Sequence, residues 1–181
     1  SLESIATSRA TFDVTGIDKS ANERIHGIKD GGFDFTSFFN PTAGQAFPVL
    51  KALPTTDVVC SYFRGTVIGN PAASCVSKQI NYDLNRGQDG SLGGTTQCLA
   101  NAAGLEYAEQ LTAGKRTDTS ATNGTSLNNG AATALGLSAY LQVFSVAGTS
   151  VTVAVQQSSD DGGGDAYAAI LTFTTVSAGS L

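Results

Sequence analysis

Apolar and polar residues alternate along much of this chain, a pattern that predicts β-strands. The clearest stretch is 32–63, GFDFTSFFNPTAGQAFPVLKALPTTDVVCSYF. Phe33 and Phe35 alternate with polar neighbours at its start, as in a half-buried strand. The alternation resumes over Val58–Phe63 at its end. Two strands with aromatic side chains are therefore predicted on either side of a loop.

A short helix is predicted between these two strands, over Ala46–Leu53. Its apolar side chains recur every third residue, which places them on one face of a helix: Phe47, Leu50 and Leu53. Pro48 falls in the first turn, where the missing N–H costs little, and Pro54 ends the helix.

The same alternation predicts most of the remaining chain to be strand. These further segments are Ser8–Ile17, Thr66–Ile68, Ala72–Leu84, Ser91–Ala100, Ala139–Ala147, Ser150–Gln157 and Ala166–Val176. The turn signal at 85–90 joins two of them in a hairpin, and Gly148-Thr149 joins a second pair. Leu105–Leu111 fits either a short helix or an edge strand. With about eight to ten strands and one short helix, the expected fold class is an all-β sandwich or barrel.

Three polar stretches are predicted to lack regular structure. Residues 18–28 have no clean period and contain the only histidine, His26, and Gly31-Gly32 reads as a turn. Residues 112–130 form a polar loop longer than most connections in compact domains, so the loop is expected to be functional or mobile. We expect a single domain over residues 1–181.

Composition narrows the class of protein. Hydrophobic residues make up 41% of the chain and charged residues only 14%, a balance that suits a surface largely covered by neighbouring subunits. The net charge of −5 argues against a DNA-binding groove, and no apolar run is long enough for a membrane span. The three cysteines, Cys60, Cys75 and Cys98, are widely spaced and are predicted to be free, buried thiols.

No residue pattern for catalysis or metal binding stands out. His26 is isolated, and the chain has neither a G-x-S-x-G motif nor a phosphate-binding glycine loop. Residues 83–90 resemble part of a calcium loop, but Gly94 stands where the bidentate glutamate belongs, which favours a hairpin turn. The acidic stretch 160–165 reads as a flexible hairpin tip. We therefore predict no catalytic residue, no cofactor site and no metal site, and a protein that is not an enzyme.

A resemblance to a known family rests on three segments. SFFNPTAGQAFPVLKALPTTDVVCSYFRG, GNPAAS at 69–74 and AYLQVFSVAGTSVTVAVQQSSDDG at 139–162 resemble the major tail (tail tube) proteins of long-tailed, non-contractile actinobacteriophages. The resemblance covers about Ser8 to Val176. It implies a β-sandwich or barrel of the tail tube type, with sheets joined between subunits.

The resemblance also implies the partners and location of the protein. Copies would form stacked, hexameric rings in the phage tail of the virion, and genomic DNA would pass through the lumen without specific binding. Other tail proteins (tape measure, terminator and distal tail) would be partners, and no membrane would be involved. Two alternatives stay open: a capsid decoration or head–tail connector protein, and a carbohydrate-binding tail-tip module.

Overall fold

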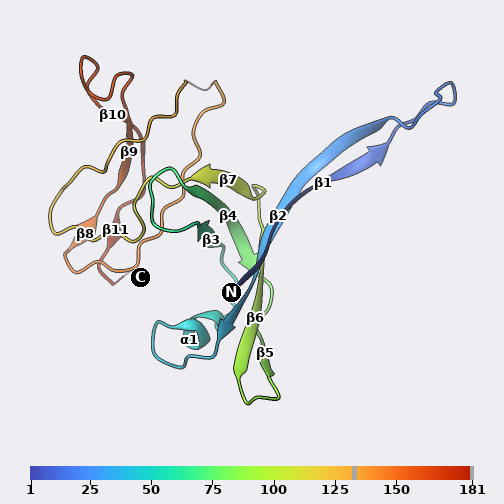
Figure 1. Ribbon diagram of the computed structural model, residues 1–181, viewed down its shortest axis with the longest axis horizontal. Helices are drawn as coiled ribbons and strands as arrows, with labels where there is room; N and C mark the ends of the chain where they lie inside the picture. Colours follow the sequence, from blue (N-terminus) through green and yellow to red (C-terminus); the bar gives the residue numbers. More distant parts are fainter. Residues whose placement is uncertain (132–133, 180–181) are drawn as a thin grey trace. The chain divides into compact units, whose positions relative to one another are not determined.

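The computed structural model describes residues 1–131 and 134–179 of the chain (Figure 1). It divides into two compact units, Ser1–Arg116 and Thr117–Leu181. Antiparallel strands dominate the described residues and the one helix is short, which confirms the all-β prediction. Contacts alone do not show whether the two units fold together or separately. The single domain over residues 1–181 therefore stays a prediction.

A seven-stranded antiparallel sheet forms the first unit, in the order β1-β2-β6-β4-β3. Strand β5 adds to β6, and β7 adds to β4. The bounds are β1 Leu2–Asp13, β2 Arg24–Phe38, β3 Val58–Phe63, β4 Pro71–Gln79, β5 Asp83–Arg86, β6 Leu92–Ala100 and β7 Glu106–Glu109. β3 therefore has the predicted bounds, while β1 begins earlier and ends earlier than the predicted strand at 8–17.

The buried core of this sheet is small. One cluster of buried side chains holds it: Phe33, Ala73, Cys75, Cys98 and Leu105. Most are small, so the sheet buries few large apolar groups, while more than twenty large hydrophobic side chains of the described residues are exposed. Much of the apolar surface of the described residues is therefore exposed.

Strand β2 runs through the two glycines that were predicted to turn, and that prediction is wrong. Gly31 and Gly32 lie inside β2, in register with Thr7 and Ala6 of β1. A Cβ on Gly31 would meet the backbone oxygen of Ala6 at 2.6 Å, and a Cβ on Gly32 would meet that of Cys98 at 2.5 Å. These glycines allow close approach of backbone rather than a change of direction.

The segment 71–100 folds as the predicted hairpin, with one change. The predicted strand 72–84 is interrupted after Gln79, because the Asn81 side chain accepts the Gln97 N–H at 2.8 Å in place of a ladder bond. β5 then pairs with β6 across a turn at 87–91, and β4 pairs with the far end of β6. β6 thus binds two successive strands along one edge.

The predictions for two short segments near β4 have different outcomes. Leu105–Leu111 contains an edge strand, β7, which pairs with the first half of β4, so the strand alternative holds and the helix does not. The predicted strand Thr66–Ile68 is wrong, because these residues belong to a turn closed by the hydrogen bond from Asn70 N–H to the Val67 carbonyl, 3.2 Å. Gly65 and Gly69, both with positive φ, flank it.

The predicted helix is present but shorter. Helix α1 covers Ala46–Leu50, and Leu53 already has a φ of 43°, outside any right-handed helix. The Phe47 ring lies 4.8 Å from the Phe39 ring and 6.4 Å from the Tyr82 ring, centroid to centroid. These aromatic contacts, together with the hydrogen bond from the Gln79 side-chain amide to the Leu50 carbonyl at 2.7 Å, hold the helix in place of the predicted Leu53 face.

Among its described residues, the second unit contains two small sheets. Its strands are β8 Ser150–Val151, β9 Ala154–Gln157, β10 Ala168–Thr172 and β11 Val176–Ser177. β9 pairs with β10 across the predicted turn at 158–165, and β8 pairs with β11. The predicted strand Ala139–Ala147 is wrong, because these residues carry no strand, so the predicted hairpin with 150–157 does not form. Alternation indicates that a segment could be a strand but does not supply the partner that would pair with it. Residues 112–130 carry no helix or strand, as predicted.

Candidate interaction surface

The most exposed part of the first unit is the hairpin of β1 and β2. β2 pairs with β6 only from Gly32 onward, so residues 24–30 of β2 pair with β1 alone. We call residues 9–29, the outer part of this hairpin with its connecting loop, the arm. In Figure 1 it projects away from the rest of the sheet as a two-stranded ribbon. The prediction of a loop over 18–28 is therefore wrong for residues 24–28.

The two faces of the arm differ in polarity. Phe12 stands directly opposite Ile25 on one face, and Thr11 stands directly opposite His26 on the other. Phe12 is 57% exposed and Ile25 is 54% exposed. The Phe12 ring also covers Gly27, since a Cβ there would meet it at 2.7 Å. One face of the arm is thus apolar and uncovered by described residues.

Hydrogen bonds within the arm fix the shape of its outer end. The Val14 N–H donates to the Glu23 carbonyl at 2.9 Å, and the Glu23 N–H donates to the Thr15 hydroxyl at 2.8 Å. Lys19 and Glu23 form an ion pair at 3.4 Å. Ile17 at the tip is fully exposed. The arm therefore presents apolar side chains from a hydrogen-bonded frame.

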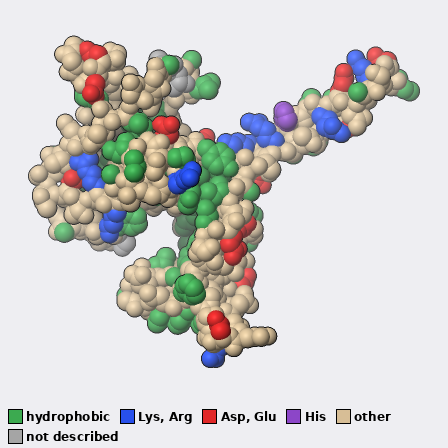
Figure 2. All heavy atoms as spheres, in the orientation of Figure 1, with side chains coloured by type: hydrophobic (Ala, Val, Ile, Leu, Met, Phe, Trp, Pro, Cys, Tyr) green, Lys and Arg blue, Asp and Glu red, His purple; other side chains and the backbone are tan. Residues whose placement is uncertain are grey.

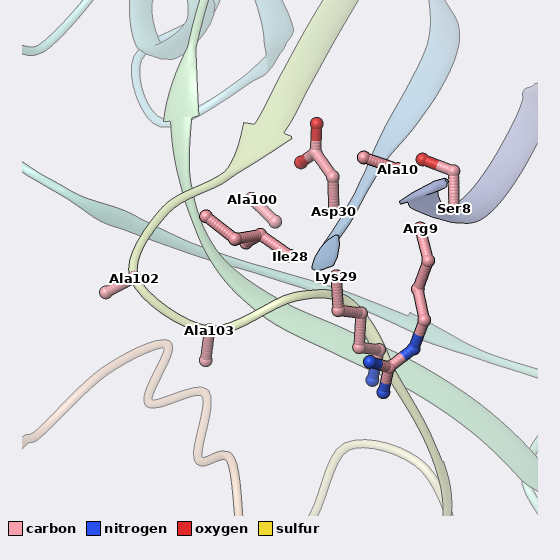
Figure 3. A pocket seen from close by; sticks show the side chains of 9 residues that line it. All are labelled: Ser8, Arg9, Ala10, Ile28, Lys29, Asp30, Ala100, Ala102 and Ala103. Carbon is pink, nitrogen blue, oxygen red and sulfur yellow. The ribbon is translucent and has the colours of Figure 1, made fainter. Parts of the chain in front are cut away.

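An open depression of about 590 Å³ lies at the base of the arm. Figure 3 shows its lining, in which the side chains of Arg9 and Lys29 extend in the same direction and that of Asp30 points elsewhere. Arg9 and Lys29 are directly opposite each other in the ladder. Like charges so placed repel, and among the described residues no ion pair joins either to a carboxylate. The base of the arm can accept an anionic group.

The outer edge of β1 adds an unsatisfied backbone ladder. β1 ends the strand order of the sheet, and no described strand pairs with its outer side. At twelve residues it is longer than most protected edge strands.

Figure 2 shows Lys and Arg side chains and the histidine along the arm, with acidic side chains toward its outer end.

The residues weighed earlier for chemistry do not gather into a site. His26 is an exposed residue on the polar face of the arm. Asp89 accepts hydrogen bonds from the Ser91 N–H (3.0 Å) and hydroxyl (2.7 Å), which lower the pKa of its carboxyl and confirm the turn interpretation. Among the described residues no group of His, Cys, Asp or Glu is arranged to hold a metal ion.

The carboxylate and hydroxyl groups of the acidic loop 158–165 also bond to other residues of the same loop. The Asp160 carboxylate accepts backbone N–H groups from Gly164 and Asp165, which lower its pKa. The Ser158 hydroxyl accepts the Gly162 N–H at 2.7 Å. The loop is thus held by hydrogen bonds between its own residues, as a structured tip between β9 and β10.

Sequence reasoning missed the arm, although its signal was present. Ala10 and Phe12 of β1 and Val14 just after it alternate with polar residues, and Ile25 and Gly27 continue the same face on β2. The polar tip between them hid the pairing, because the interval 15–23 has no short turn signature.

No protein-family model matches the chain, and no curated protein matches it either. In the described parts of the chain, no helix has the length and apolar character needed to cross a bilayer.

Proposed function

We propose that this protein is a structural subunit of a phage tail tube, which assembles with copies of itself into stacked, hexameric rings in the virion. The observation that carries the proposal is the apolar face of the arm. A chain that buries little in its own core and projects an apolar ribbon is suited to burial against a neighbour.

The energetics of the arm support a partner. An isolated two-stranded ribbon is at best marginally stable in water. Because Phe12 is 57% exposed and Ile25 is 54% exposed, burying the rest of each in an interface would contribute about 0.8–1.7 kcal/mol from the apolar area removed from water. The free edge of β1 would gain a ladder in the same step.

Charge supports a second copy of this chain as that partner. The chain carries a net charge of −5, while the base of the arm presents the adjacent cations Arg9 and Lys29. An acidic surface elsewhere on a neighbouring copy would complement them. An arm that binds a different surface on the next copy makes a head-to-tail contact, which closes into rings or continues as a filament.

The resemblance of the sequence to tail tube proteins supports the remaining parts of the proposal. The sheets of neighbouring subunits would join as a β-barrel around a lumen. The net acidic chain would let genomic DNA pass without binding, since like charges repel. Tape measure, terminator and distal tail proteins would be the other partners, and the role is not enzymatic.

Negative-stain electron microscopy of the purified full chain over a range of concentrations tests this function. Stacked rings or tubes of one phage tail's width are expected. Isolated trimers or single closed rings would instead favour the capsid decoration or connector alternative. Monomers at every concentration that bind glycans would support the tail-tip alternative and overturn the proposal.

A further inference from the structure

Among the described residues, three buried hydroxyl groups have no hydrogen-bond partner within the protein. They are Ser37 Oγ, Tyr82 Oη and Thr96 Oγ1. Thr96 is fully buried, and the oxygens of the other two are shielded even though parts of their residues are accessible. Folded proteins satisfy nearly all buried polar groups, because burying one without a partner costs its hydration. Three such groups in one sheet point to a shared partner.

The three hydroxyl-bearing residues gather around Gly94 of β6. Ser37 of β2 stands directly opposite Gly94, and Thr96 lies two residues further along β6, so these positions share one face of the sheet. Tyr82, which directly precedes β5, covers Gly94 on the same face, since a Cβ on Gly94 would lie 2.9 Å from its hydroxyl oxygen. The Tyr82 hydroxyl therefore lies where a side chain of residue 94 would be, next to Ser37 across the ladder.

The chemistry of these groups selects the kind of partner. None of the three hydroxyls bonds another, and each can donate one hydrogen bond and accept two. Neighbouring polar groups that do not bond directly are commonly bridged by an ordered water, which makes about three hydrogen bonds when it is buried. An apolar ligand would leave all three hydroxyls unpaired.

We propose that one internal water molecule binds between the hydroxyls of Ser37, Tyr82 and Thr96. The water donates to two of the hydroxyls and accepts from the third, so it satisfies all three groups at once. It joins β2 and β6 to the segment that precedes β5. Tyr82 also contacts Phe47 of α1, with 6.4 Å between the ring centres. The water thus fixes the ring against which the helix packs.

Crystallography of the full chain, at a resolution that shows ordered waters, tests the proposal directly. The expected result is one density peak within hydrogen-bond distance of the hydroxyl oxygens of Ser37, Tyr82 and Thr96. A direct hydrogen bond between any two of these hydroxyls, or no peak between them, would overturn the proposal.

Stability measurements in solution give a second readout. Tyr82→Phe removes one hydroxyl and keeps the ring that contacts Phe47. Loss of a hydroxyl that bonds an internal water should raise the equilibrium constant of unfolding about two- to tenfold, measured with urea. Loss of an unpaired hydroxyl would instead leave this constant unchanged or lower it. Tyr107→Phe is the matched control, because Tyr107 is 67% exposed and its hydroxyl should matter less than about twofold.

A double variant tests whether the hydroxyls share one water. Ser37→Ala alone should raise the unfolding constant by a factor similar to that of Tyr82→Phe. In the Tyr82→Phe background its effect should be smaller, because the shared water is already lost. Effects that simply multiply, or a Tyr82→Phe variant as stable as Tyr107→Phe, would contradict a shared water.

Discussion

Gly32 marks one of the closest backbone approaches in the sheet. A Cβ there would lie 2.5 Å from the Cys98 carbonyl oxygen, so Gly32→Ala must push β2 away from β6. We expect a loss of about 1–3 kcal/mol in the free energy of unfolding, measured with urea. Gly93→Ala in β6 is the matched control, because its nearest atom is 3.7 Å away. Equal effects of the two variants would refute the close-approach explanation.

The contacts of Asp57 predict that the stability of the fold decreases at acidic pH. A hydrogen bond from Lys78, with a second from Asn101, lowers the pKa of Asp57 below its ordinary value of 3.8. Since the folded pKa lies below the unfolded one, this contribution is present above pH 3.8 and is lost as pH falls through the folded pKa. Asp57→Asn should therefore lose less stability than wild type between pH 5 and pH 2, compared by thermal melts. An unchanged slope would contradict this.

Single residues also show what sequence could and could not predict. The alternating Phe33 and the buried, free Cys75 and Cys98 were predictable, because apolar periodicity and unpaired cysteines point inward. The role of Gly31 and Gly32 was not, because glycine permits both a turn and a close approach. The local sequence does not contain the distant atom that decides between them.

Phe47 makes the aromatic contacts of helix α1. Phe47 contacts the Phe39 and Tyr82 rings, and the Lys51 ammonium lies 4.7 Å from its ring centre. Phe47→Ala should cost about 2–4 kcal/mol in unfolding free energy. Val49→Ala in the same helix should cost less than about 0.5 kcal/mol, because Val49 is more than half exposed. Similar losses in both variants would mean that the helix is not held through Phe47.

Elements were predictable where a strand's own pattern is strong, as for β3 and the β5–β6 hairpin. They were missed where pairing with a distant strand, and not the local propensity of the residues, decides where a strand begins and ends. β2 extends into a polar segment because β1 lies beside it, and the predicted strand at 72–84 breaks where Asn81 bonds Gln97. The edge strand β7 was ambiguous for the same reason, since its contact with β4 is long-range.

At the scale of the whole molecule, periodicity predicted the all-β class, which the strands confirm. The hydrophobic, weakly charged composition predicts surfaces covered by neighbouring subunits, and this stays a prediction. The location of such a surface needed the fold, because Phe12 and Ile25 become neighbours only through the register of β1 and β2.

Sedimentation velocity of a matched pair of arm variants tests the central claim most directly. Phe12→Asp and Thr11→Asp place the same charge at adjacent positions of β1, on the apolar and polar faces respectively. We predict that Thr11→Asp assembles like wild type at equal concentration, while Phe12→Asp stays monomeric with an unchanged circular dichroism spectrum. Full assembly of Phe12→Asp, or equal loss in both variants, would contradict the account.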